Sequence, residues 1–247
     1  MEILSVKNIT KSFGENRIIE NVSLTLNKGE LVSLLGVSGA GKTTLFNCIS
    51  GIDKADSGQI ILQGEDISGT PGQISYMLQK DLLLPYKKII DNVSLPLLLS
   101  GKKKTEARET ALSHFAEFGI EGTENYYPSQ LSGGMRQRAA LLRTYLASKG
   151  VALLDEPFSA LDTITKGAMH SWYLSVMEKI DLSTIFITHD IDEAVLLSDR
   201  ILILSGKPGK ITDEIIINQP KPRSSDFNLT PDFLEYKKQV INALGNI

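Results

Sequence analysis

The spacing of hydrophobic and polar residues changes its period along the chain. From Met1 to about Ser75, short β-rich runs alternate with Gly, Asn and Asp, which predicts a sheet-rich part. Between Lys88 and Ala147, apolar residues recur three and four positions apart, which predicts helices. We therefore expect a sheet-rich part followed by a helical insert.

Two later runs predict strands that are buried on both faces. VALLD (151–155) and STIFIT (183–188) are almost continuously apolar, and each precedes polar residues and a helix-like stretch. Such runs are typical of parallel sheets covered by helices on both faces. The tail predicts a hairpin around Gly206 to Gly209, an extended proline-containing connection over 218–231 and a closing amphipathic helix.

Length and composition exclude several classes of protein. The chain has 247 residues, of which 42% are hydrophobic, so it can bury a large core without a disulfide or metal. Its single Cys and its N-terminal segment indicate a reducing, cytosolic context, and no apolar run approaches the roughly 18 residues that a spanning helix needs. A pI of about 5.7 argues against a nucleic-acid partner, and we interpret Lys102 to Lys104 as a solvated loop.

A glycine-rich segment follows a predicted strand and opens a predicted helix. Its residues are Gly36, Val37, Ser38, Gly39, Ala40, Gly41, Lys42 and Thr43, in the pattern G-x-x-x-x-G-K-[ST]. The glycines let backbone N–H groups converge on one point, and the helix adds the positive end of its dipole. Lys42 can reach the β- and γ-phosphates, the Thr43 hydroxyl can ligate Mg²⁺, and Thr44 offers a second contact. A glycine-rich turn with an incidental lysine is the structural alternative.

A carboxylate pair follows the buried strand 151–155. Asp155 ends this strand at the edge where parallel sheets place ligands, so we interpret it as the magnesium-coordinating carboxylate. Glu156 points to a different side and can accept a hydrogen bond from a water aligned with the γ-phosphate, as general base. Both residues could instead cap a helix, but the nearby phosphate-binding pattern favours the catalytic interpretation.

With these residues, the chain resembles the ATP-binding subunit of ABC transporters over nearly its whole length. The distinguishing segment is Leu131, Ser132, Gly133, Gly134 and Met135, which is similar to the family signature. Ser132 and the amides of the two glycines open a helix and form a second anion site, although a capped helix with a flexible Gly-Gly is the structural alternative. The resemblance implies that this segment serves the ATP of a partner copy, so that two such subunits, most simply identical, sandwich two nucleotides.

The resemblance assigns roles to four more residues. Phe13 matches the aromatic that stacks on adenine, with a core strand position as the alternative. Gln79 matches the glutamine that reaches Mg²⁺ and the attacking water. Asp162 matches the dimer-loop residue that organises the opposite site, with a helix cap as the alternative, and His189 matches the switch histidine that contacts the γ-phosphate. The expected catalytic residues are Glu156, His189 and Gln79, and the expected Mg²⁺ ligands are Thr43, Gln79 and Asp155.

The resemblance also implies the fold. We expect an α/β chain with a P-loop NTPase core, a mainly parallel sheet, an N-terminal antiparallel β subdomain and an inserted α-helical subdomain. In one domain spanning 1–247, the core and β subdomain would cover about 1–87 and 150–217. The helical subdomain would cover 88–149, and a C-terminal extension would cover 218–247.

The segment Asp81 to Tyr86, DLLLPY, is expected to expose three leucines, a proline and a tyrosine as a partner surface. In the family this region receives a membrane permease, with local core packing as the alternative. The free-standing chain and its tail resemble bacterial importer subunits of the nitrate, sulfonate, taurine and thiamine-pyrimidine-precursor group. Met135 and Tyr86 depart mildly from that group's pattern.

The resemblance therefore implies an ATPase, with ATP and Mg²⁺ as cofactors, that drives solute uptake at the cytoplasmic face of the membrane. Its implied partners are a permease docking near Gln79 to Tyr86, a second ATP-binding subunit and an extracytoplasmic solute-binding protein, but no nucleic acid. An exporter subunit and a non-transport ABC ATPase acting on nucleic acid or ribosomes are the alternatives. None of the motif residues would touch the transported molecule, so the sequence leaves it unidentified.

Overall fold

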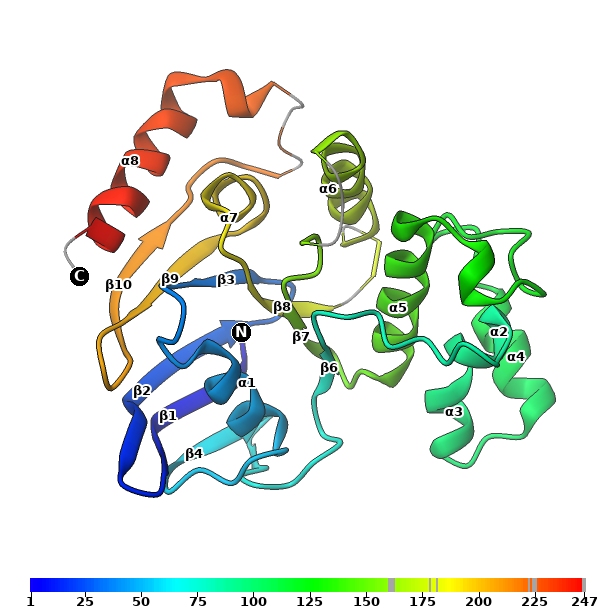
Figure 1. The fold of residues 1–247 in the computed structure, drawn as a ribbon, viewed down its shortest axis with the longest axis horizontal. Helices are drawn as coiled ribbons and strands as arrows, with labels where there is room; N and C mark the ends of the chain where they lie inside the picture. Colours follow the sequence, from blue (N-terminus) through cyan, green and yellow to red (C-terminus); the bar gives the residue numbers. More distant parts are fainter. Residues whose placement is uncertain (160–162, 178, 181, 222, 224–225, 246–247) are drawn as a thin grey trace.

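The computed structural model describes residues 1–159, 163–177, 179–180, 182–221, 223 and 226–245. A six-stranded sheet with the order β10-β9-β3-β8-β7-β6 forms the centre of the molecule (Figure 1). Its strands are β3 (Leu31–Leu35), β6 (Ser75–Met77), β7 (Val151–Asp155), β8 (Ser183–Ile187), β9 (Arg200–Ser205) and β10 (Lys210–Ile216). All neighbours are parallel except β9 and β10. Every residue of β3, β7 and β8 is buried, as their apolar runs predict.

An antiparallel sheet with the order β2-β1-β4-β5 packs below the central sheet (Figure 1). Its strands are β1 (Glu2–Phe13), β2 (Asn16–Asn27), β4 (Ser57–Leu62) and β5 (Glu65–Asp66). Apolar residues of this sheet, of the central strands and of helix α1 (Lys42–Ser50) share one core. The predicted mainly parallel α/β core with an N-terminal antiparallel sheet is therefore confirmed.

Helices cluster beyond the β6 edge of the central sheet (Figure 1). They are α2 (Ile89–Val93), α3 (Leu95–Leu99), α4 (Lys104–Leu112) and α5 (Gly133–Ala147), with a 3₁₀ turn at η1 (Pro128–Gln130). The apolar spacing that predicts helices between Lys88 and Ala147 continues through Phe118, but α4 ends at Leu112. Residues 113–119 form turns that still bury Phe115 and Phe118 in the core, so the apolar spacing marks burial rather than helix.

The last third of the chain supplies helices that pack near both edges of the sheet, the first with β6 and the last with β10. It contains α6 (Thr163–Met177), α7 (Ile191–Leu197), the 3₁₀ turn η2 (Phe227–Leu229) and α8 (Pro231–Gly245). The predicted hairpin is present because β9 pairs with β10 on either side of residues 206–209, and the predicted closing helix is α8, which packs with α7. None of the helices in the described ranges is long and apolar enough to cross a membrane.

Candidate nucleotide-binding and catalytic site

The glycine-rich segment is a loop between β3 and α1. The Lys42 ammonium donates hydrogen bonds to the carbonyl oxygens of Gly36 (2.7 Å) and Val37 (3.1 Å), so it folds back over the loop. A Cβ atom at Gly36 would lie 2.1 Å from the carbonyl oxygen of Leu204, so only glycine lets the loop approach β9 this closely. Gly41 precedes α1 with a φ of 97°, which turns the chain into the helix.

Most of the other predicted residues of the loop are accessible from solvent. Val37, Ser38 and Gly39 are exposed, whereas Ala40 is buried beneath them. The Thr43 side chain is exposed and that of Thr44 is half-buried.

Lys42 shares its space with the predicted carboxylate pair. Burial lowers the pKa of Lys42, and the negative charges of Glu156 and Asp155 oppose that shift. The three charges are therefore close in space although they come from distant parts of the chain. A cation facing two carboxylates across a glycine-rich loop can bind a phosphate together with a divalent cation.

Asp155 lies at the carboxyl end of β7 and is 9% exposed. The hydroxyl of Tyr76 donates a hydrogen bond to its Oδ2 atom at 3.3 Å. Burial raises the pKa of Asp155 above its usual range, and the hydrogen bond from Tyr76 and the charge of Lys42 offset this only in part. A cation bound beside a buried carboxylate offsets the cost of burying its charge, which fits the predicted role as a metal ligand.

Gln79, Glu156 and His189, the three expected catalytic residues, form one cluster. The Gln79 amide donates to Glu156 Oε2 at 2.8 Å, and His189 Nδ1 lies 3.1 Å from Glu156 Oε1. They follow β6, β7 and β8 respectively, so parallel strands bring their carboxyl ends to the same edge of the sheet.

The backbone of Glu156 is in the left-handed region, with a φ of 47°. Its N–H donates to the carbonyl of Ile187 at 2.9 Å, which anchors this conformation on β8. A non-glycine residue in this region is strained, and such strain concentrates at functional sites. The sequence contains no signal for this turn.

Phe13 ends β1 and its side chain is 51% exposed. The ammonium of Lys11 lies 5.1 Å from the ring centroid. The alternative that Phe13 is a core residue is therefore wrong, and the ring face is accessible to an aromatic base. Its stacking on adenine stays a prediction.

The signature segment opens α5. Ser132 Oγ accepts a hydrogen bond from the backbone N–H of Met135 at 3.3 Å, which is an N-cap, and Gly133 and Gly134 are partly exposed beside it. Leu131 is buried and Met135 packs against the same core. In Figure 1, α5 lies beyond β6 and β7 from α1, so the structure does not bring this signature to its own phosphate-binding loop. Asp162, the predicted dimer-loop residue, lies outside the described residues.

The predicted docking segment 81–86 is only partly a surface. Leu82 is 52% and Tyr86 72% exposed, whereas Leu83 is 7% exposed and belongs to the core of the helical region. The expectation that all three leucines are exposed is wrong, because Leu82 has a φ of 44° and this turn directs Leu83 inward.

Two arginines of α5 hold this segment, and sequence reasoning missed both. Arg143 donates to the carbonyl oxygens of Leu82 (2.9 Å) and Asp81 (2.5 Å), and Arg136 Nε lies 3.2 Å from Asp81 Oδ2. The segment beside Gln79 is thus tied to the helix that begins at the signature. No pattern in the sequence indicates these contacts, because they link residues more than 50 positions apart.

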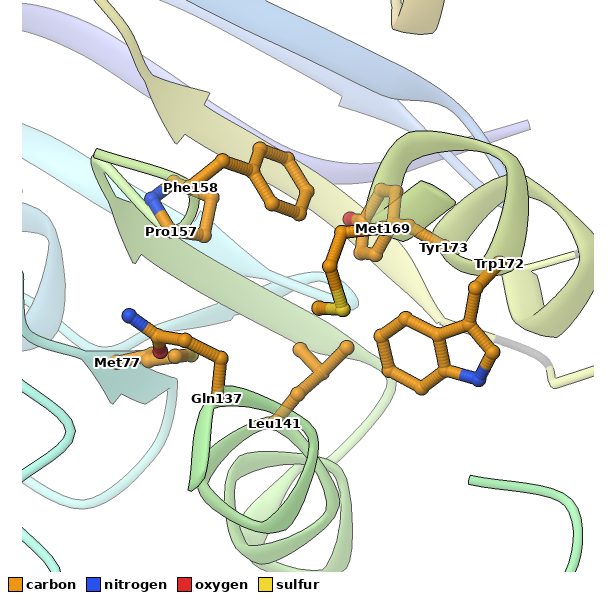
Figure 2. A pocket seen from close by; sticks show the side chains of 8 residues that line it. All are labelled: Met77, Gln137, Leu141, Pro157, Phe158, Met169, Trp172 and Tyr173. Atoms are coloured by element: carbon orange, nitrogen blue, oxygen red, sulfur yellow. The ribbon is translucent and has the colours of Figure 1, made fainter. Parts of the chain in front are cut away.

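A small apolar cavity lies behind the catalytic cluster. Figure 2 shows side chains from β6, α5, the segment after Glu156 and α6 surrounding it: Met77, Gln137, Leu141, Pro157, Phe158, Met169, Trp172 and Tyr173. Gln137 is 4% exposed and its Oε1 atom has no hydrogen-bond partner within the described chain. Residues of the signature helix α5 and of the segment after Glu156 therefore line the same cavity.

Comparisons with known proteins agree with this geometry. The family model "ABC transporter" matches residues 19–159, and the chain belongs to this family. It is 46% identical over 208 residues to the formylaminopyrimidine import ATP-binding protein ThiZ of Halalkalibacterium halodurans, covering 84% of this chain and 81% of that protein. It is 37% identical over 235 residues to the aliphatic sulfonates import ATP-binding protein SsuB of Bacillus cereus, covering 95% and 91%.

A solved structure shows the same fold. The dimeric post-hydrolysis state of the ATP-binding cassette MJ0796 with ADP and Pi superimposes with a TM-score of 0.74 at 29% identity, covering 88% of this chain and all of that chain. The predicted ABC ATPase fold and the resemblance to importer ATP-binding subunits are therefore confirmed. The chain is an ATP-binding, ATP-hydrolysing cassette of this family.

Proposed function

We propose that this chain is the ATP-hydrolysing subunit that drives the import of a small solute through a separate membrane permease. The observation that carries the catalytic part is the Gln79–Glu156–His189 cluster at the carboxyl ends of parallel strands, next to Lys42. The importer part is supported by relatives named for import.

The residues divide the reaction between binding and proton transfer. The N–H groups of the glycine-rich loop and Lys42 hold the phosphates of ATP, and Phe13 stacks on the adenine. Glu156 accepts the proton of a water that attacks the γ-phosphate, with Gln79 and His189 fixing the direction of its carboxylate. His189, which is 65% exposed, is free to contact the γ-phosphate when nucleotide binds.

The donor set fits Mg²⁺. Asp155, the Thr43 hydroxyl and the Gln79 amide oxygen are hard oxygen ligands of the kind that Mg²⁺ prefers, and Asp155 is buried beside the loop. When bound, the cation would neutralise charge on the phosphates.

We further propose that two copies form the active unit. In each site, Ser132, Gly133 and Gly134 of one copy would complete the phosphate contacts of the other. The support is that this segment is a capped helix start away from its own loop, and that MJ0796 is described as a dimer.

The permease would dock on the exposed residues Leu82 and Tyr86, which places the subunit at the cytoplasmic face of the membrane. An extracytoplasmic binding protein would deliver the solute. The higher identity to ThiZ than to SsuB favours a pyrimidine-type organic solute over a sulfonate. Recovery of a permease and a binding protein with the tagged chain from native membranes would support import, and the ligand of that binding protein would identify the solute. Recovery of ribosomal proteins or nucleic acid would contradict it.

Glu156→Gln tests the catalytic assignment. We expect turnover to fall by at least about 10²-fold, since a general base contributes roughly 10²–10⁴. ATP binding should persist and a nucleotide-bound dimer should accumulate in size-exclusion chromatography. The matched control is Glu109→Gln, an exposed position on α4. Near-normal hydrolysis by the Glu156 variant would remove Glu156 as the base.

A further inference from the structure

An ion-pair cluster joins α6 to the segment that carries His189. The Lys166 ammonium of α6 lies 2.7 Å from Asp190 Oδ2 and 2.6 Å from Glu193 Oε1. Asp190 is the N-cap of α7 and Glu193 belongs to its first turn. One lysine of α6 therefore holds the beginning of α7 by two carboxylates.

The same cluster fixes the residue that precedes His189. The Thr188 hydroxyl donates to Glu193 Oε2 at 2.5 Å and accepts from the backbone N–H of Asp190 at 3.0 Å. Glu193 is also 3.4 Å from the Nε2 atom of His170 on α6. The residues on both sides of His189 are thus bound to this cluster.

The cluster is buried and charged. Glu193 is 3% exposed, and the Lys166 side chain is 20% exposed. Burial alone would raise the pKa of Glu193, but its contacts with His170, Lys166 and Thr188 outweigh burial and lower the pKa. Burial would likewise lower the pKa of Lys166, but Asp190 and Glu193 raise it. Removing Lys166 would leave a buried carboxylate without its cation, which is costly.

His189 has no such support on its own ring. Its side chain is 65% exposed, and within the described part of the chain its ring has one polar contact, Glu156. The direction of the imidazole therefore depends on this one contact and on the backbone between Thr188 and Asp190. A displacement of about 1 Å at a catalytic group can cost roughly 10²-fold in rate.

We propose that Lys166 and Glu193 are positioning residues for His189, acting from α6 through the Thr188–Asp190 backbone. The expected effect on ATP turnover rests on the proposed function. The expected effect on the position of the His189 ring does not depend on it. The competing explanation is that the ion pair only stabilises α7.

The three histidines of the chain provide a direct test. His170 belongs to the cluster, His189 is its expected target, and His114 pairs with Glu117 in the helical region. Imidazole NMR signals should be recorded for Lys166→Met and for Glu193→Gln, whose side chain keeps its size. We expect the His170 and His189 signals to shift and that of His114 to stay. A shifted His170 signal with an unchanged His189 signal in both variants would overturn the proposal.

Kinetics separate positioning from stability. We expect Lys166→Met to lower kcat by between about 10- and 100-fold while KM for ATP changes by less than about twofold, because Lys42 and the glycine-rich loop, which hold most of the phosphate contacts, are not part of this cluster. Lys166→Arg should restore most of kcat, since a guanidinium can reach both carboxylates. An equal loss in the Arg and Met variants would count against the proposal.

The matched control is Glu30→Gln. Glu30 pairs with Arg200 Nε at 2.5 Å and its side chain is 11% exposed, but it precedes the amino end of β3, whereas His189 follows the carboxyl end of the neighbouring parallel strand β8. This variant should lose thermal stability and leave the His189 signal unchanged. If it shifts that signal as Lys166→Met does, the effect is general loosening and the proposal fails. Normal turnover of His189→Ala would instead contradict the catalytic role of His189, which the NMR test does not assume.

Discussion

Leu82 and Leu83 are adjacent leucines with opposite environments, and substituting each by alanine tests the structure of the predicted docking segment. Leu83 is 7% exposed within the helical-region core, whereas Leu82 is 52% exposed. Removing a buried leucine side chain beyond Cβ costs about 2–5 kcal/mol. For a chain of this length each kcal/mol lowers the melting temperature by roughly 2–4 °C. We therefore expect Leu83→Ala to melt about 4–20 °C lower.

Leu82→Ala should change the free energy of unfolding by no more than about 0.5 kcal/mol, because its side chain has little packing to lose. The positive φ of Leu82 does not confound the comparison, since alanine also carries a Cβ atom. Differential scanning calorimetry of the two variants and the parent protein gives the melting temperatures. Equal destabilisation by both variants would refute the inward turn of Leu83.

Uptake and ATPase activity should separate the exposed residues from the buried one. Leu82→Ala and Tyr86→Ala should lower uptake in cells while the purified subunit keeps its ATPase activity, because these side chains face outward. Leu83→Asp, which places a carboxylate in the core, should lower both through loss of fold. Unchanged uptake in the Leu82 and Tyr86 variants would contradict the docking surface.

Two further predictions concern the phosphate and metal contacts. Lys42→Ala should raise the dissociation constant for ATP at least tenfold, which corresponds to about 1.4 kcal/mol for a lost charge-assisted contact. Isothermal titration calorimetry measures this constant, and an unchanged value would contradict the role of Lys42 in phosphate binding. Mg²⁺ binding requires the ionised form of Asp155. The pKa of this carboxyl is raised above the ordinary value for aspartate of about 4. The affinity for Mg²⁺ should therefore fall as the pH decreases through that raised pKa. Asp155→Asn should remove this pH dependence, and a pH dependence that is the same in the variant and in the parent protein would show that Asp155 is not the ligand.

The candidate site could be predicted to a large extent because its signals are local. The glycine spacing of residues 36–43 specifies the turn between strand and helix, and the apolar runs before Asp155 and His189 place both at strand ends. Once these strands are recognised as parallel, their carboxyl ends meet at one edge. That is why Gln79, Glu156 and His189 are adjacent as expected. The division into subdomains and the dimer-loop role of Asp162 stay predictions.

The failures of prediction also have a common cause. The apolar pattern after Leu112 indicates burial but continues past the end of the helix, and the leucines of 81–86 look equivalent in sequence. Their environments depend on Arg143 and on the left-handed turn at Leu82, which no local pattern specifies.

The sequence by itself determined the strands, the phosphate-binding loop and the capped start of the signature helix, because each depends on neighbouring residues and on glycine's freedom of φ. Only the tertiary structure decided that Leu83 is core, that Glu156 adopts a strained turn, and that Lys166 of α6 pairs with Asp190 and Glu193 beside His189. These features arise from contacts between residues far apart in the chain, so they exist only once the sheet and its covering helices have packed together.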